Sequence, residues 1–197
     1  MKVNKFLSVI SILTIVVMLI GATFAYFSVS TASNEGAIAA EAAYFDIKLA
    51  VEPLYTGKSL IPTNDSDIDI AFNNECVDKY NNGACSAYTI KVRNDGQEGD
   101  YIGNIEFNLV GITNLKYRLL DENGNVYVND TLIESDTIQS LGNQFMMNNG
   151  DEKTFTLVIW LSNKQYIQDD DDANGSFSAS VTYTSSVGSR VTASFSA

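Results

Sequence analysis

Short stretches in which apolar and polar residues alternate recur along this 197-residue chain, and they constrain its fold more than any other feature. Most of them end near Gly, Asn or Asp, the residues that favour turns. Because side chains of a strand point to two faces in turn, such a stretch predicts a β-strand with one buried face. We count about eight to ten of these stretches and little helix. The pattern predicts an all-β fold, an antiparallel β-sandwich or jelly roll.

Individual elements can be assigned from the same pattern. Residues 153–162 (KTFTLVIWLS) form the most apolar run, which is typical of a central strand, with Trp160 in the core. A hairpin is predicted around Asn123-Gly124, because this pair favours a tight turn between strands. Residues 37–43 are rich in Ala, which indicates a short helix. Further strands are expected at residues 44–51, 67–72, 87–94, 101–112, 115–121, 126–130, 175–186 and 191–197.

The chain contains no histidine, which limits the chemistry that it can perform. It lacks the commonest general base, the commonest zinc ligand and the base of Ser-His or Cys-His catalysis. The motifs H-E-x-x-H and G-x-S-x-G are absent too. We therefore predict that the protein is not an enzyme. A hydrolase that uses carboxylates is the remaining catalytic alternative, and no paired acid stands out from the loops to serve it.

The balance of charge is strongly acidic, with 12 Lys and Arg against 24 Asp and Glu and a net charge of −12. Such a chain has too few cations to neutralise phosphates over a surface, so we expect no nucleic-acid partner. The balance favours a soluble protein outside the cell, one that meets cations.

A run of four acidic residues is the main candidate for a metal site: Asp169, Asp170, Asp171 and Asp172. Carboxylate oxygens suit Ca²⁺, but the spacing does not match an EF-hand loop, and a solvated loop is the alternative interpretation. Residues 63–69 form a second, weaker acidic loop. Apart from this possible Ca²⁺, no cofactor is expected.

The two cysteines, Cys76 and Cys85, flank an Asn-Asn-Gly turn at residues 81–83. A metal pair would need further Cys or His ligands, and a catalytic Cys would need a His; the chain supplies neither. Since export leads to an oxidising compartment, we predict a structural disulfide that closes the loop before the strand at residues 87–94.

The N-terminus has the form of an export signal. A short basic start, MKVNK, precedes residues 6–25, which are uncharged and mostly apolar. These 20 residues exceed a signal peptide core of about 7–15 residues and just reach the length of a membrane-spanning helix, about 20, so the length alone leaves both interpretations open. Thr23 and Ala25 place small residues before a cut at Tyr26. We predict a cleavable signal helix at residues 1–25; an uncleaved membrane anchor is the alternative, and either exports the rest.

The segment GATFAYFSVSTAS, at residues 21–33, resembles the G-T-[YFW]-A-[YA]-F-[ST] signature of proteins exported by the SipW type of signal peptidase. These are the TasA and camelysin-like surface proteins of Gram-positive bacteria. The extra residue Ala22 departs from the signature. The residues that match it are Gly21, Thr23, Phe24 and Ala25 at the signal end and Tyr26, Phe27 and Ser28 at the mature start.

This resemblance implies a signal peptidase as a partner, a β-sandwich fold and a place at the cell surface or in a biofilm matrix. It also implies assembly into fibres. Camelysin-like relatives carry a metalloprotease label, but without His this chain has no zinc ligand of that kind, so we do not carry the activity over.

From these observations we predict an exported subunit of an extracellular, biofilm-matrix-like fibre whose partner is another copy of itself. Residues 26–43 would hold a donor-type strand and a linker, and residues 44–197 the sandwich. The donor strand would use Tyr26, Phe27, Val29 and Thr31, with Phe27 and Val29 as buried anchors in a neighbouring sheet. The alternative is a membrane-anchored or secreted cell-surface binding module that meets the membrane only through residues 6–25.

Overall fold

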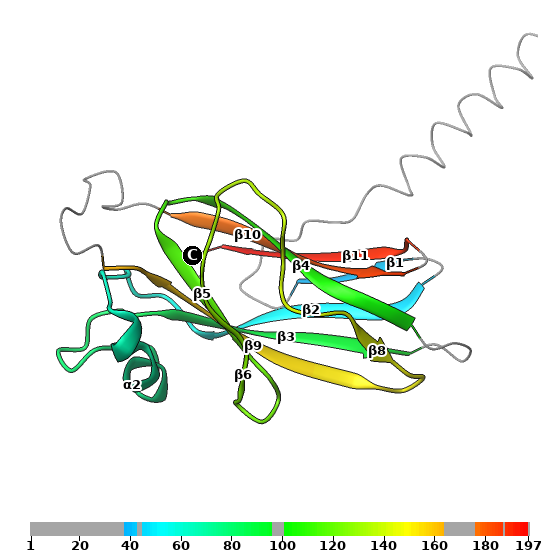
Figure 1. Ribbon diagram of the computed structural model, residues 1–197, viewed down its shortest axis with the longest axis horizontal. Helices are drawn as coiled ribbons and strands as arrows, with labels where there is room; N and C mark the ends of the chain where they lie inside the picture. The colour runs from blue at the N-terminus through cyan, green and yellow to red at the C-terminus, as the bar shows by residue number, and fades with distance from the viewer. Residues whose placement is uncertain (1–37, 43–44, 96–100, 164–175, 187, 197) are drawn as a thin grey trace, which may run out of the picture. The chain divides into compact units, whose positions relative to one another are not determined.

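The fold consists of two antiparallel β-sheets that pack face to face, as a computed structural model shows for residues 38–42, 45–95, 101–163, 176–186 and 188–196 (Figure 1). One sheet has six strands in the order β1-β2-β3-β9-β5-β6, and the other has five, in the order β11-β10-β4-β7 with β8 also on β4. The strands are β1 (Ile38–Ala42), β2 (Phe45–Tyr55), β3 (Ser86–Asn94), β4 (Tyr101–Gly111), β5 (Leu115–Leu120), β6 (Val126–Leu132), β7 (Gln139–Ser140), β8 (Phe145–Met147), β9 (Glu152–Leu161), β10 (Phe177–Ser185) and β11 (Arg190–Ser196).

This architecture confirms the prediction of an antiparallel β-sandwich. The expected signal helix lies outside the described residues. Within the described ranges, no helix is long and apolar enough to cross a membrane.

The core between the sheets is built by alternation along each strand. In β2, Ile47, Leu49 and Val51 are buried, as an apolar face of period two requires. In β4, Ile105 and Phe107 face the same interior and are fully or almost fully buried. Side chains from the two sheets thus interdigitate in one apolar layer, which supplies most of the driving force for folding.

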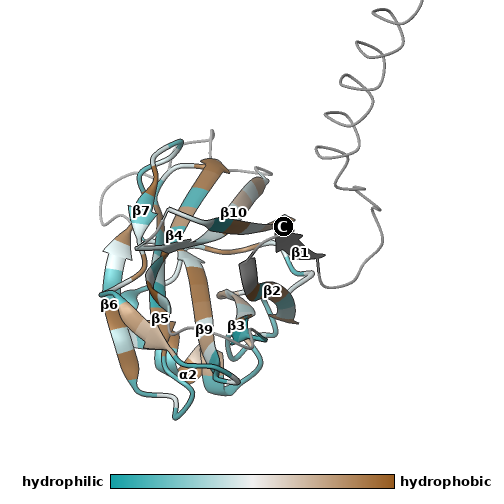
Figure 2. Ribbon diagram, turned by 90° about the vertical axis from the view of Figure 1, so that its right-hand side faces the viewer, coloured by the Kyte–Doolittle hydropathy of each residue, from teal (hydrophilic) through white to brown (hydrophobic). Residues whose placement is uncertain are grey.

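Strand β9 is apolar on both of its faces. It lies between β3 and β5, which confirms the predicted central position. Leu157 and Ile159 point into the sandwich, whereas Val158 and Trp160 belong to a second apolar cluster outside it. The brown segments along β9 in Figure 2 show this apolar content. Because β9 is apolar on both faces, other parts of the protein must shield each face from water.

Two predicted elements are wrong, each because tertiary packing overrides local pattern. Residues 67–72 form not a strand but most of the helix α2 (Ile68–Asn73), which follows the 3₁₀ turn η1 (Asp65–Asp67). The spacing of Ile68 and Ala71 suits one face of a helix, and both are buried. The Ala-rich residues 37–43 contain the strand β1 instead of a helix, because β1 pairs with β2 in the register Ile38↔Val51.

The other predicted strands are confirmed with small changes at their ends. The hairpin around Asn123-Gly124 joins β5 to β6. Its turn is closed by Asp121, whose carboxylate accepts hydrogen bonds from the backbone N–H of Asn123 and of Asn125, and Gly124 supplies a φ of 78°.

A buried hydroxyl on β3 gives the first test of this core. Tyr88 is 1% exposed, and its hydroxyl has no hydrogen-bond partner among the described residues. Burial raises the pKa of Tyr88 to about 12. An unpaired buried hydroxyl is unfavourable. We expect Tyr88→Phe to leave the free energy of unfolding unchanged or to raise it by about 1 kcal/mol, as measured by urea denaturation.

The matched control is Tyr117→Phe on β5. Tyr117 is also buried, but its hydroxyl is hydrogen-bonded to the side chain of Thr131. Removing that hydroxyl should lower the free energy of unfolding by about 1 kcal/mol. If Tyr88→Phe destabilised the protein as much as Tyr117→Phe does, the hydroxyl of Tyr88 would have a partner in solution.

Candidate functional site

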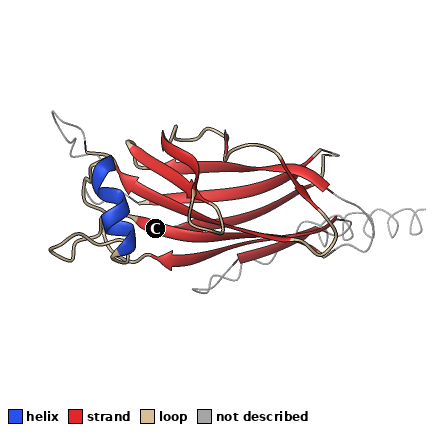
Figure 3. Cartoon of the chain, turned by 60° about the horizontal axis from the view of Figure 1, so that its bottom comes forward, coloured by secondary structure: helices blue, strands red, loops and turns tan. Residues whose placement is uncertain are grey.

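Residues 56–85, which we call the cap, connect β2 to β3 and contain η1, α2 and the loop between the cysteines. The helix of the cap lies at one end of the strands (Figure 3). It covers the outer face of the six-stranded sheet, where Ile68 and Ala71 pack with Val158 and Trp160. The cap therefore provides the cover that the second apolar face of β9 requires.

Ion pairs fasten the cap to the sheet. Arg118 on β5 is 7% exposed and donates two hydrogen bonds to Asp130, from Nε at 2.6 Å and from an Nη at 3.0 Å. Its other Nη donates to Asp69 on α2. The hydrogen bonds to Asp130, above all, raise the pKa of Arg118 above its usual value. Arg118 is thus a charged link between the hairpin β5–β6 and the helix.

A second link joins η1 to the same face. The carboxylate of Asp65 accepts from Lys116 Nζ at 2.5 Å and from the indole Nε1 of Trp160 at 3.2 Å. The indole N–H of a buried Trp usually needs a partner, and Asp65 supplies it here. Two acidic residues of the loop at residues 63–69 therefore form ion pairs with the sheet: Asp65 with Lys116, and Asp69 with Arg118.

The predicted disulfide is present in the cap. The sulfurs of Cys76 and Cys85 are 2.05 Å apart, and both side chains are buried in the outer cluster. A disulfide is typical of proteins that fold in an oxidising compartment, which fits an extracellular or cell-surface protein.

The loop closed by the disulfide is ordered by Asp78. Its carboxylate accepts hydrogen bonds from the backbone N–H of Tyr80 and of Asn82 and from the side chain of Asn82. The hydrogen bond from the Asn82 side chain is the largest cause that lowers the pKa of Asp78. Because the pKa is lowered on folding, this contribution to stability is present above the ordinary Asp pKa and is lost as the pH falls through the lowered value.

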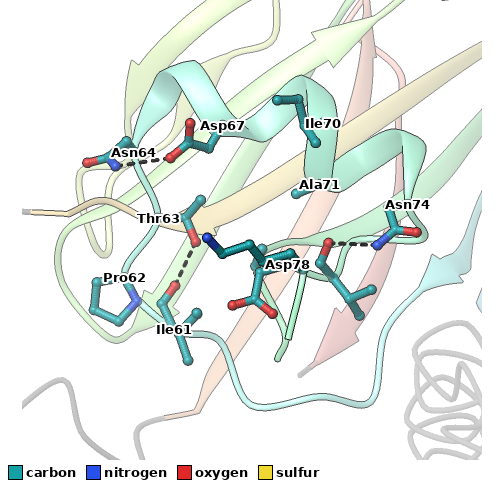
Figure 4. Close-up of a pocket in the computed structure, with 12 residues that line it drawn as sticks. Ile61, Pro62, Thr63, Asn64, Asp67, Ile70, Ala71, Asn74 and Asp78 are labelled. Carbon is teal, nitrogen blue, oxygen red and sulfur yellow. Dashed lines mark hydrogen bonds between the residues drawn. The ribbon is translucent and has the colours of Figure 1, made fainter. Parts of the chain in front are cut away.

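The cap forms an open hollow of about 480 Å³, whose lining residues are drawn in Figure 4. Its apolar lining comes from three segments of the cap: Ile61 and Pro62, then Ile70 and Ala71 on α2, then Val77 and Ala84 beside the disulfide. Its polar lining consists of Thr63, Asn64, Asp67, Asn74, Asp78 and Lys79. The hollow is mostly aliphatic, with carboxylates and amides around it.

Some polar groups of this hollow are held by local hydrogen bonds. The Thr63 hydroxyl donates to the carbonyl of Ile61, and Asn64 donates to Asp67 (Figure 4). Such a mixture of apolar lining and a few placed polar groups is the usual form of a ligand site.

A second hollow of about 390 Å³ lies where β2 ends. Leu54 and Tyr55 line it from the strand, and both cysteines and Val77 line it from the cap. Val77 lines both hollows.

Most of the residues that the sequence singled out lie outside the described residues. These are the acidic run at residues 169–172, the cleavage residues Thr23, Ala25 and Tyr26, and the donor-strand residues Phe27, Val29 and Thr31. Their roles stay predictions. Within the described ranges, no group of three or more acidic or Cys residues is arranged to hold a metal ion.

Sequence reasoning missed the hollow of the cap. The signal that was available is the spacing of Ile68 and Ala71, which marks α2 as a helix with one buried face. No local pattern would have placed Ile61 and Val77 beside it, since they come from loops that backbone pairing, the disulfide and the ion pairs bring together.

Comparisons with known proteins identify no family for this chain. No family model matches it, and no curated protein matches its sequence. Among solved structures, it is similar to the sporulation control protein Spo0M of Bacillus subtilis, with 10% identity, a TM-score of 0.37, 75% of this chain covered and 47% of that chain. The chain thus spans about half the length of Spo0M.

Two further similarities are to adhesin domains. A PA14 sugar-binding domain from an RTX adhesin matches with 10% identity and a TM-score of 0.32, over 84% of this chain and 89% of that chain. The CupB6 tip adhesin of Pseudomonas aeruginosa matches with 9% identity and a TM-score of 0.33, over 77% of this chain and 44% of that chain. We base no functional assignment on similarities at this level.

The link through Arg118 can be tested by Arg118→Met. This change leaves Asp130, whose side chain is 18% exposed, without its cation. Breaking such a pair from one side should lower the free energy of unfolding by about 3 kcal/mol. Urea denaturation followed by the fluorescence of Trp160, the only Trp of the chain, measures this value.

The matched control is Lys91→Met, which removes a pair with Glu52 at 2.7 Å whose side chains are 38% and 40% exposed. Its effect should be below about 1 kcal/mol, since exposed pairs contribute little. Equal effects of the two substitutions would show that Arg118 does not fasten the cap.

The disulfide can be tested with the double variant Cys76→Ser, Cys85→Ser. We expect a loss of about 2–3 kcal/mol in the free energy of unfolding. Because the sandwich interior contains neither cysteine, far-ultraviolet circular dichroism should keep its β-sheet signal while Trp160 emission shifts to the red. Unchanged Trp160 emission together with unchanged stability would contradict the role of the disulfide in holding the cap.

Proposed function

We propose that this chain is an exported structural subunit of an extracellular fibre or matrix, in which the N-terminal strand of one copy adds to a sheet of the next. The observation that carries the proposal is the position of β1. Among the described residues it is the edge strand of the six-stranded sheet, and it lies within residues 26–43, which we predicted to hold the donor strand and its linker. Residues that precede Ile38 therefore join the domain at a sheet edge, where backbone groups are available for pairing.

The pairing of β2 supports the sheet edge at β1 and β2 as the place where the strand of a neighbouring copy is added. Strand β1 pairs with residues 45–51 of β2, whereas β3 pairs with β2 as far as Tyr55. Among the described residues, the end of β2 from Glu52 onward has no partner strand on the side of β1. An added strand would gain main-chain hydrogen bonds there, although Pro53 offers only its carbonyl.

The exposure of side chains along β2 supports the same edge. Ile47, Leu49 and Val51 are buried on one face, but Pro53, the next residue on that face, is exposed. Strand β11 of the other sheet lies beside β1 and β2. Apolar side chains of an added strand, such as Phe27 and Val29, would cover this end of the core. A contact between one copy's strand and the next copy's edge is heterologous, so it builds open filaments.

A second candidate is a cell-surface binding module, and the hollow of the cap favours it. The two candidates differ in the N-terminus that they require. A mature chain that begins at Tyr26, found by N-terminal sequencing of the exported protein, supports the fibre subunit. A chain that still begins at Met1 supports the anchored module.

The fibre proposal is tested by a variant that lacks residues 26–33. We expect it to stay monomeric in size-exclusion chromatography and to form no filaments in electron microscopy, because the donor strand is gone. Its Trp160 emission should match that of the mature chain, which shows that the sandwich and cap are folded. Filaments like those of the mature chain would falsify the proposal.

Point variants test which face of the donor strand is buried in the neighbouring copy. Phe27→Ser with Val29→Ser should abolish filaments, since both anchors would lie on the buried face. Ser28→Ala with Ser30→Ala changes the opposite face and serves as the matched control, which should assemble normally. Equal assembly by the two double variants would contradict burial of Phe27 and Val29.

A further inference from the structure

The large hollow of the cap is a preformed site that strand addition does not use. Its lining residues come from segments that are already fixed, by the disulfide at Val77 and Ala84 and by the links of Asp65 and Asp69 to the sheet. A ligand that enters it need not order these segments, which favours binding. At its mouth Ile70 is 72% exposed, so a large aliphatic side chain meets solvent there.

The charges at the hollow are mainly negative. The carboxylate of Asp67 accepts hydrogen bonds from Asn64 and Ser66, and that of Asp78 accepts from the loop around Tyr80. Within the described part of the chain, neither carboxylate forms an ion pair. Lys79 is the lining cation, and its Nζ lies 4.9 Å from the centroid of the Tyr80 ring. The charge of Lys79 also acts on Asp78, so two carboxylates against one ammonium group leave the lining with a net charge of −1, which favours a positively charged ligand.

The residues that line the hollow further restrict the class of ligand that it can bind. The residues that line the hollow include no aromatic ring, so it lacks the stacking surface on which sugars commonly bind. Its apolar part is aliphatic and its volume of about 480 Å³ suits one side chain with its neighbours. A second copy of this chain, with a net charge of −12, presents mostly the wrong sign.

We infer that this hollow binds a peptide segment of a partner protein in which an aliphatic side chain stands next to Lys or Arg. The aliphatic group fills the space between Ile61, Ala71 and Val77, and the basic group lies at Asp67 and Asp78. This inference goes beyond the fibre proposal and does not depend on it, since neither strand addition nor cleavage at Tyr26 is involved.

The probe is the peptide acetyl-Lys-Leu-Lys-amide, added to the exported full-length protein. Saturation-transfer NMR on the leucine methyl signals reports binding whether the protein is monomeric or assembled. A single anchor of this size should bind with a Kd of about 1 mM. Acetyl-Glu-Leu-Glu-amide and acetyl-Lys-Ser-Lys-amide should each bind at least about fivefold more weakly, because one lacks the charge and the other lacks the anchor.

Variants locate the binding in the hollow. Ile70→Ser and Asp67→Asn should each weaken the Lys-Leu-Lys peptide at least about threefold. The matched controls are Val126→Ser, at a side chain that is 53% exposed on β6, and Glu122→Gln, at an exposed residue of the β5–β6 turn. Neither control should change the Kd.

Three results overturn the inference. The first is equal binding of the acidic and basic peptides, and the second is equal effects of the hollow variants and their controls. The third is displacement of the basic peptide by the chain's own segment YFSVSTASN, residues 26–34, at lower concentration than the basic peptide requires. That last result would make a second copy the occupant. Filament formation is measured separately, so failure here leaves the fibre proposal as it stands.

Discussion

The apolar character of β9 on both faces is the constraint on which the rest of the structure depends. Its inner side chains need the second sheet, and its outer side chains Val158 and Trp160 need a separate cover. A sandwich of two sheets leaves outer faces in contact with water, so a chain with this strand at its centre must supply an additional layer. The cap is that layer, and this explains why residues 56–85 depart from the strand pattern of the rest.

The fold could be predicted from sequence because a period of two reports directly on a half-buried strand. Strands such as β3 and β10 carry that signal in their own residues. Residues 67–72 misled the prediction because Asp-Ile-Asp-Ile alternates like a strand. What decides in favour of a helix is remote: the burial of Ile68 against Trp160 and the ion pair of Asp69 with Arg118. Neither of these two contacts can be inferred from the local sequence pattern.

The hollow of the cap could not be predicted from the sequence, because it too depends on contacts between residues that are far apart in the chain. The disulfide could be predicted from the sequence, because the N-terminus has the form of an export signal and the chain has two cysteines. The hollow requires in addition that the loop at Ile61 be held near α2, which follows from backbone pairing such as the hydrogen bond from Ile61 N–H to the carbonyl of Gly83. A shape that depends on three segments of the cap is a property of packing, and no single stretch of sequence encodes it.

The small number of cations determines how charge is distributed over the molecule. Lys48, Lys91 and Arg93 each pair with carboxylates on or beside the six-stranded sheet, and Lys116 and Arg118 hold the cap. Acids outside these pairs leave a negative surface, which opposes contacts between copies through charged faces. Residues 26–34 are uncharged, so contact through them avoids that repulsion. In our proposals, one acidic composition thus favours both kinds of contact: apolar contacts between copies through residues 26–34, and contacts of a basic partner with Asp67 and Asp78.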